Sequence, residues 1–166
     1  MPQAILIGPP GCGKSTVGAA LASALGCEFV DTDAAVESSY GQKIADIFVD
    51  KGEDFFRELE FVELEKALEN ENCILSLGGG APIPERAQNL LSVCTAPIIF
   101  LDVSLSAAAP RVGFNRDRPL LLGNPRAQWQ ALAETRRPIY ESLASTVIKV
   151  DDMTVDELVK SIEEII

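Results

Sequence analysis

The stretch that decides the fold is GPPGCGKST at residues 8–16, which fits the pattern G-x-x-x-x-G-K-[ST] of a phosphate-binding loop. Its glycines allow consecutive backbone N–H groups to turn toward a phosphate, Lys14 supplies a positive charge, and the Ser15 hydroxyl can ligate a magnesium ion. The motif should follow a buried strand and open a helix, and an apolar run at 4–7 and a helical pattern over 17–25 meet both conditions. A glycine-rich turn that binds nothing is the weaker alternative. The motif therefore predicts a nucleoside triphosphate site.

The rest of the chain alternates between short apolar runs and segments with helical periodicity. The strand-like runs lie at 4–7, 28–30, 73–77, 97–101 and 146–150. This alternation is typical of an α/β fold with a mainly parallel sheet and helices on both of its faces. At 166 residues the chain has the length of one domain.

Two segments between the predicted strands stand out. Residues 34–70 are too long for one crossover helix and predict a helical insertion, broken near Gly41 and Gly52. Residues 112–125 mix Gly, Asn, Asp, Pro and Arg between two helices, which is the composition of a mobile lid. Closure of such a lid would bring arginines over the phosphates and exclude water.

Composition narrows the chemistry. The formal net charge of −11 disfavours nucleic acid and anionic membranes as partners. The chain has no histidine, so a carboxylate or water must accept any proton. Four widely spaced cysteines indicate neither a zinc site nor a disulfide framework, and we find no signal peptide or membrane segment. We therefore expect a cytoplasmic protein.

Arginine is concentrated in one part of this acidic chain. Residues 111–137 hold six of its eight arginines. Such a segment suits an anionic small molecule, although a solvated helix face would show the same pattern.

Acidic residues follow two of the predicted strands. Asp31 and Asp33 come directly after the second run and, if the strand continues, would share one face. One could then hold magnesium through water, while the other binds an acceptor hydroxyl and takes its proton. Alternatively, one of them caps the helix expected from residue 34. Asp102 competes with Asp31 for the magnesium role, although its position favours an ordinary strand end.

Three consecutive glycines, Gly78, Gly79 and Gly80, follow the third predicted strand. In open α/β sheets ligands bind at the carboxyl ends of the strands, where bare backbone permits close approach. A flexible turn before the next helix is an equally good interpretation of the triplet alone.

Taken together, these motifs resemble the shikimate kinase family over nearly the whole chain. The series is the loop at 8–16, D-x-D at 31–33, I-A-D-I-F at 44–48, F-R-x-x-E at 56–60, G-G-G at 78–80, R-P-L-L at 118–121 and R-x-P-x-Y at 136–140. The resemblance implies a P-loop kinase fold with a five-stranded parallel sheet in the order 2-3-1-4-5. It implies transfer of the ATP γ-phosphoryl group to the 3-hydroxyl of shikimate, on the route to chorismate and the aromatic amino acids. The implied partners are shikimate, ATP and Mg²⁺, and we expect a monomer.

The resemblance also implies roles for matching positions. Catalytic roles fall to Asp33 as proton acceptor, to Lys14, and to Arg118 entering from the lid. Shikimate would be bound by Asp33, Arg57, Gly78, Gly79, Gly80 and Arg136. ATP would be bound by Gly11, Cys12, Gly13, Lys14, Ser15, Thr16, Arg111 and Arg118. Magnesium would be held by Ser15, with Asp31 behind it, and Glu60 would orient Arg57. Residues 151–154 are shorter and more acidic than the adenine loop of many relatives.

Three rival interpretations fit the sequence less well. Adenylate kinase would need a D-G-[FY]-P-R stretch, which is absent, and gluconate kinase lacks the combination of F-R-x-x-E with R-x-P-x-Y. The third is a catalytically silent kinase-like binding protein. Its expected signature is loss of Lys14, Asp33 or a site arginine, and none of these is lost.

Overall fold

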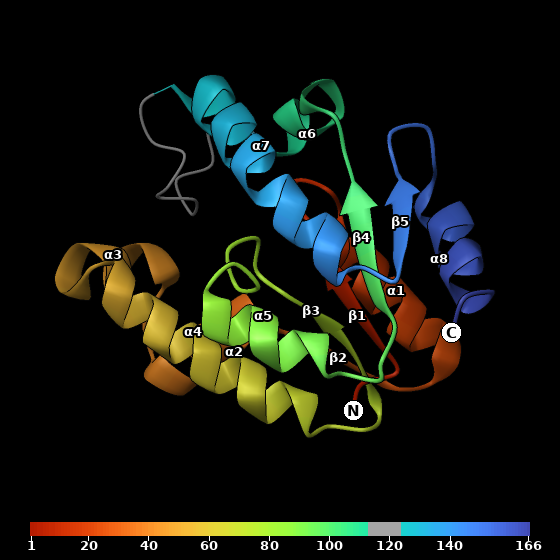
Figure 1. Cartoon of the computed structure of the whole chain (residues 1–166), viewed down its shortest axis with the longest axis horizontal. Helices are drawn as coiled ribbons and strands as arrows, with labels where there is room; N and C mark the ends of the chain where they lie inside the picture. Colours follow the sequence, from red (N-terminus) through yellow and green to blue (C-terminus); the bar gives the residue numbers. More distant parts are fainter. Residues whose placement is uncertain (113–123) are drawn as a thin grey trace.

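The computed structural model describes residues 1–112 and 124–166. Within them, five parallel strands form one sheet in the order β2-β3-β1-β4-β5 (Figure 1). The strands are β1 (Ala4–Ile7), β2 (Glu28–Asp31), β3 (Cys73–Ser76), β4 (Ile98–Asp102) and β5 (Thr146–Lys149). The predicted fold class and strand order are therefore confirmed.

Helices cover both faces of the sheet (Figure 1). The described helices are α1 (Lys14–Leu25), α2 (Thr32–Tyr40), α3 (Ile44–Lys51), α4 (Glu53–Leu68), α5 (Glu85–Ser92), α6 (Leu105–Val112), α7 (Pro125–Leu143) and α8 (Val155–Glu163). Side chains alternate along the central strand β1: Ala4 and Leu6 face a core shared with α1 and α8, while Ile5 and Ile7 face one shared with α4, α5 and α7. All four are fully buried, as expected for a parallel strand covered on both faces.

The segment after β2 forms three helices with a small core of their own. Val36, Ile47 and Phe56 are buried there, one from each helix. The helices α2 and α3 end at Gly41 and Gly52, both with positive φ, which glycine adopts without steric cost. The predicted breaks near these glycines are confirmed. Figure 1 shows α3 at the end of this group farthest from the sheet.

The start of α2 differs from the sequence-based expectation. This helix begins at Thr32 rather than at residue 34, because one Asp31 carboxylate oxygen accepts hydrogen bonds from the backbone N–H groups of Asp33 and Ala34. Asp31 is thus the N-cap, a position that favours aspartate. The alternative in which one acid caps this helix is confirmed. The interpretation of Asp33 as a continuation of the strand is wrong.

Most of the predicted lid lies outside the described residues, which stop at Val112 and resume at Asn124. The lid at 112–125 and the role of Arg118 therefore stay predictions. Over the described residues, no helix is both long and apolar enough to cross a membrane.

Candidate active site

The phosphate-binding loop links the carboxyl end of β1 to α1, as the motif requires. Gly8, Gly11 and Gly13 have φ values of 148°, 84° and 93°. A Cβ atom on Gly8 would lie 2.7 Å from the Leu101 carbonyl oxygen, so a larger residue there would meet backbone. The loop ends at Lys14, the first residue of α1, and so presents a helix N-terminus to an anion.

The Lys14 side chain is buried and folds back across this loop. Its ammonium donates hydrogen bonds to the carbonyl oxygens of Gly8, at 2.7 Å, and Pro9, at 3.1 Å. It also borders a cavity of about 270 Å³. The cavity is lined by the phosphate loop, Asp31 and Asp33, Ser76 and Leu77, Gly78 and Gly79, and Arg111. Residues predicted to bind phosphate, metal and acceptor thus border one space.

Oxygen atoms at one side of this cavity suit a magnesium ion. The Ser15 hydroxyl donates a hydrogen bond of 2.7 Å to the Asp31 carboxylate, whose other oxygen caps α2. The Ser76 hydroxyl also lines the cavity, is 1% exposed, and has no hydrogen-bond partner among the described residues. A buried hydroxyl without a partner is costly, and hydroxyl and carboxylate oxygens are ligands that Mg²⁺ accepts, directly or through water. The residues present therefore fit this ion.

Asp102, the competing candidate for the metal, lies elsewhere. Its carboxylate forms an ion pair with the Arg137 guanidinium on α7, and it lines a different pocket with Lys149 and Asp151. That pairing raises the pKa of Arg137. The strand-end interpretation of Asp102 is confirmed.

The glycine triplet follows β3 after one intervening residue, with a charged side chain beside each of its residues. A Cβ atom on Gly78 would meet the Asp33 carboxylate, one on Gly79 would lie 3.3 Å from Arg136 Nη1, and one on Gly80 would lie 2.7 Å from Arg57 Cζ. Asp33 reaches this place from the first turn of α2. One carboxylate and two guanidiniums from three helices therefore gather along this bare backbone.

Two hydroxyl groups hold the triplet in place. The Thr32 hydroxyl accepts a hydrogen bond of 2.9 Å from the Gly78 N–H. The Tyr140 hydroxyl donates one of 2.6 Å to the Gly79 carbonyl. Both side chains are fully buried, and burial raises the pKa of Tyr140, so it remains a donor. The equally weighted interpretation of the triplet as a flexible turn is thereby disfavoured.

Arg57 is held by acidic neighbours on its own helix. Its guanidinium lies 2.7 Å from a Glu60 oxygen and 3.5 Å from a Glu53 oxygen. Glu60 is 3% exposed, and burial raises its pKa to about 7, although the charge of Arg57 and its hydrogen bond act in the opposite direction. The predicted contact through which Glu60 orients Arg57 is present.

The second guanidinium comes from α7, where Arg136 is only 7% exposed. Buried arginines need an anionic partner or several hydrogen bonds, and Arg136 lies beside Gly79, which lines the phosphate cavity. Arg111 is exposed and donates a hydrogen bond of 3.1 Å to the Gly11 carbonyl, which places it next to the phosphate loop.

Three side chains contribute to the site without a role predicted from sequence: Ser76, Trp129 and Tyr140. The indole N–H of Trp129 donates a hydrogen bond of 2.7 Å to the Pro10 carbonyl in the phosphate loop. Buried Trp and Tyr side chains usually place their polar atom on a partner, so the available signal was an aromatic donor within the arginine-rich segment, Trp129, and another just after it, Tyr140. A role for Ser76 could not be predicted from the sequence, because a serine inside an apolar run can also have no role beyond packing.

Comparison with known proteins places this geometry in a family. The family model described as shikimate kinase matches residues 10–166. The chain belongs to the shikimate kinase family. The resemblance to this family that the motifs indicated is therefore confirmed, as is the assignment to the ATP-dependent kinases.

Relatives agree over nearly the full chain. The shikimate kinase of Thermobifida fusca is 45% identical over 94% of this chain and 90% of its own. That of Rhodococcus jostii is 46% identical over 90% and 89%. The structure of shikimate kinase from Acinetobacter baumannii in complex with shikimate has a TM-score of 0.94 and 31% identity, covering 99% of this chain and 92% of its own. A gluconokinase from Sinorhizobium meliloti, at 20% identity and a TM-score of 0.59, shares the fold alone. The silent binding protein receives no support.

Proposed function

We propose that this chain transfers the γ-phosphoryl group of ATP to the 3-hydroxyl of shikimate, with the residues described above in the following roles. The observation that carries the proposal is the gathering of Asp33, Arg136 and Arg57 along the glycine triplet. This arrangement offers a base for a hydroxyl group and paired guanidiniums for a carboxylate. Shikimate carries both groups.

Different residues would recognise the carboxylate and the hydroxyl groups of the acceptor. Arg57 and Arg136 would bind the shikimate carboxylate, because guanidinium groups match a carboxylate in bidentate geometry. Asp33 would accept hydrogen bonds from the ring hydroxyls. The backbone of Gly78, Gly79 and Gly80 would lie against the ring, since they have no side chains to exclude it.

The donor side is the phosphate loop. Its N–H groups from Gly11 to Thr16, Cys12 and Gly13 included, together with the Lys14 ammonium, would hold the β- and γ-phosphates. Arg111, beside Gly11, would lie against the base of ATP. Ser15 and Asp31 would hold Mg²⁺, and Ser76 would accept or donate a hydrogen bond to its water. When bound there, Mg²⁺ would neutralise part of the charge on the ATP phosphates.

The chemical step follows from these positions. The 3-hydroxyl oxygen forms a bond to the γ-phosphorus while the bond from that phosphorus to the β,γ-bridging oxygen breaks, and ADP leaves with the electron pair. The hydroxyl proton passes to the Asp33 carboxylate. Lys14 stabilises charge on the phosphoryl oxygens, and Arg118 would join it from the lid. The proposed protein is a monomer in the cytoplasm, and its residues 34–70 form the region that binds the acceptor.

The test is a coupled assay of ADP release with magnesium-ATP and four acceptors: shikimate, quinate, gluconate and AMP. We expect shikimate to stimulate ADP release far above the rate without acceptor. Absence of stimulation by shikimate, with ATP binding intact, would sink the proposal.

The Asp33→Asn variant tests the base. It should retain ATP binding, while kcat falls at least about 100-fold, the lower range for loss of a general base. Unimpaired turnover would remove Asp33 from the proton-acceptor role. Lys160→Gln, at an exposed position on α8, serves as the charge-changing control.

A further inference from the structure

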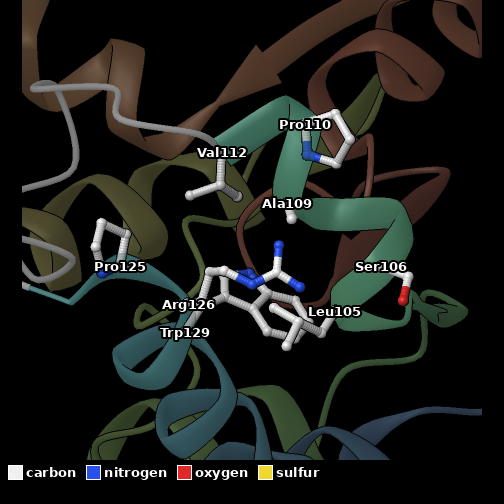
Figure 2. Close-up of a pocket in the computed structure, with 8 residues that line it drawn as sticks. All are labelled: Leu105, Ser106, Ala109, Pro110, Val112, Pro125, Arg126 and Trp129. Carbon is white, nitrogen blue, oxygen red and sulfur yellow. The ribbon is translucent and has the colours of Figure 1, made fainter.

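A second cavity lies between α6 and the start of α7, outside the residues that line the phosphate cavity (Figure 2). Its volume of about 460 Å³ is in the range of small-molecule sites. The walls that matter here are Leu105, Ala109, Pro110, Val112, Arg126 and Trp129. All but Arg126 present mainly apolar surface, so the cavity suits an apolar ring.

Among the described residues that line this cavity, Arg126 is the one with a charged side chain. Figure 2 shows the Arg126 guanidinium pointing across the space between Ala109 on α6 and Trp129 on α7. Among the side chains in the described residues, none forms an ion pair with Arg126. A cation that faces an apolar cavity favours a ligand with a negative group, even in a chain whose net charge is −11.

Two walls of the cavity also touch the phosphate loop. The Trp129 indole donates its hydrogen bond to the Pro10 carbonyl. Val112 packs against Gly11 so closely that a Cβ atom on this glycine would lie 2.8 Å from Val112 Cγ2. A ligand that shifts either side chain would therefore move the backbone that holds the phosphates.

We propose that this cavity binds a planar aromatic carboxylate, paired with Arg126, and that its occupancy is linked to nucleotide affinity through Trp129 and Val112. The proposal requires nucleotide binding at the phosphate loop but not the identity of the acceptor. Linkage is reciprocal, so nucleotide and carboxylate change each other's affinity by the same factor.

The chain offers a direct reporter, because Trp129 is its one tryptophan. The indole N–H resonance of Trp129 is followed by NMR while 2-naphthoate, or its neutral analogue 2-naphthamide, is titrated into the full chain. We expect a saturable shift, with naphthoate binding about fivefold more tightly than the amide, which is the scale of one partly exposed charge pair.

Two variants locate the ligand. Arg126→Gln should remove the preference for the carboxylate, and Ala109→Leu should fill the cavity and weaken both ligands at least tenfold. Arg86→Gln on α5, where Arg86 pairs with Glu58, is the control and should change neither affinity.

Absence of a saturable shift with naphthoate would overturn the proposal. Binding that survives both variants would place the carboxylate elsewhere, for instance between Arg57 and Arg136, and would overturn it as well. Linkage is measured as ADP affinity with and without saturating naphthoate. A change that disappears in Ala109→Leu supports linkage, and an unchanged affinity overturns it. None of these binding measurements uses shikimate, so a failure of the shikimate assay would not change how they are interpreted.

Discussion

Adding one methyl group at Gly80 should remove Arg57 from the acceptor site without touching the donor site. A Cβ atom at this position would lie 2.7 Å from Arg57 Cζ. Gly80 is not among the described glycines with positive φ, so alanine is compatible with its backbone. The flexible guanidinium, rather than the backbone, must therefore move.

The size of the effect follows from what Arg57 loses. Displacement would break its 2.7 Å contact with Glu60 and remove one guanidinium from the proposed carboxylate site. A hydrogen bond to a charged group contributes about 1.5–3 kcal/mol, so we expect the KM for shikimate to rise roughly 10- to 150-fold. The buried Glu60 would lose its partner, lowering the free energy of unfolding by about 1–3 kcal/mol. The KM for ATP should stay unchanged, since Gly80 does not line the phosphate cavity.

The assay is a double-mutant cycle. Coupled ADP release gives the KM for each substrate in the wild type, Gly80→Ala, Arg57→Ala and the double variant, and urea unfolding gives their stabilities. If Gly80→Ala acts by displacing Arg57, the double variant should match Arg57→Ala closely. Fully additive effects, or an unchanged KM for shikimate in Gly80→Ala, would refute this reasoning.

Three further substitutions probe the contacts around the site. Burial raises the pKa of Glu60 to about 7 in the folded state, so the free energy of unfolding should fall by up to roughly 3 kcal/mol as pH rises from about 4.5 to about 7. The Glu60→Gln variant, assayed by urea unfolding at both ends of this range, should lack that fall. Equal pH profiles for the variant and the wild type would contradict the assignment. Tyr140→Phe leaves the Gly79 carbonyl without its donor and should lower stability by about 1–3 kcal/mol while raising the KM for shikimate, a result that an unaltered KM would oppose. Asp31→Asn keeps a good helix cap but loses the charge beside Ser15, so the magnesium requirement should rise with little change in melting temperature; a large drop in melting temperature at an unchanged magnesium requirement would reverse this interpretation.

The parts of the site that were predictable from sequence are those built from consecutive residues. The loop at 8–16 carries its conformation in its own glycines, and Gly8, Gly11 and Gly13 adopt positive φ where the motif places them. Strand and helix periodicity likewise yielded the sheet, because burial on both faces leaves continuous apolar runs. The resemblance to a family then supplied residues that no local pattern could connect, Arg57 and Arg136 among them.

The sequence by itself determined that a phosphate-binding loop follows a buried strand, because the conformation of this loop depends on the backbone preferences of adjacent residues. Only the tertiary structure showed that Asp31 contacts Ser15 beside the phosphate loop while Asp102 pairs with Arg137 in another pocket, because these partners come from distant parts of the chain. The tertiary structure also shows that Asp33 reaches the cavity from a helix rather than a strand. Side chains from three helices gather at the glycine triplet because the order of the strands sets which loops meet at one edge of the sheet.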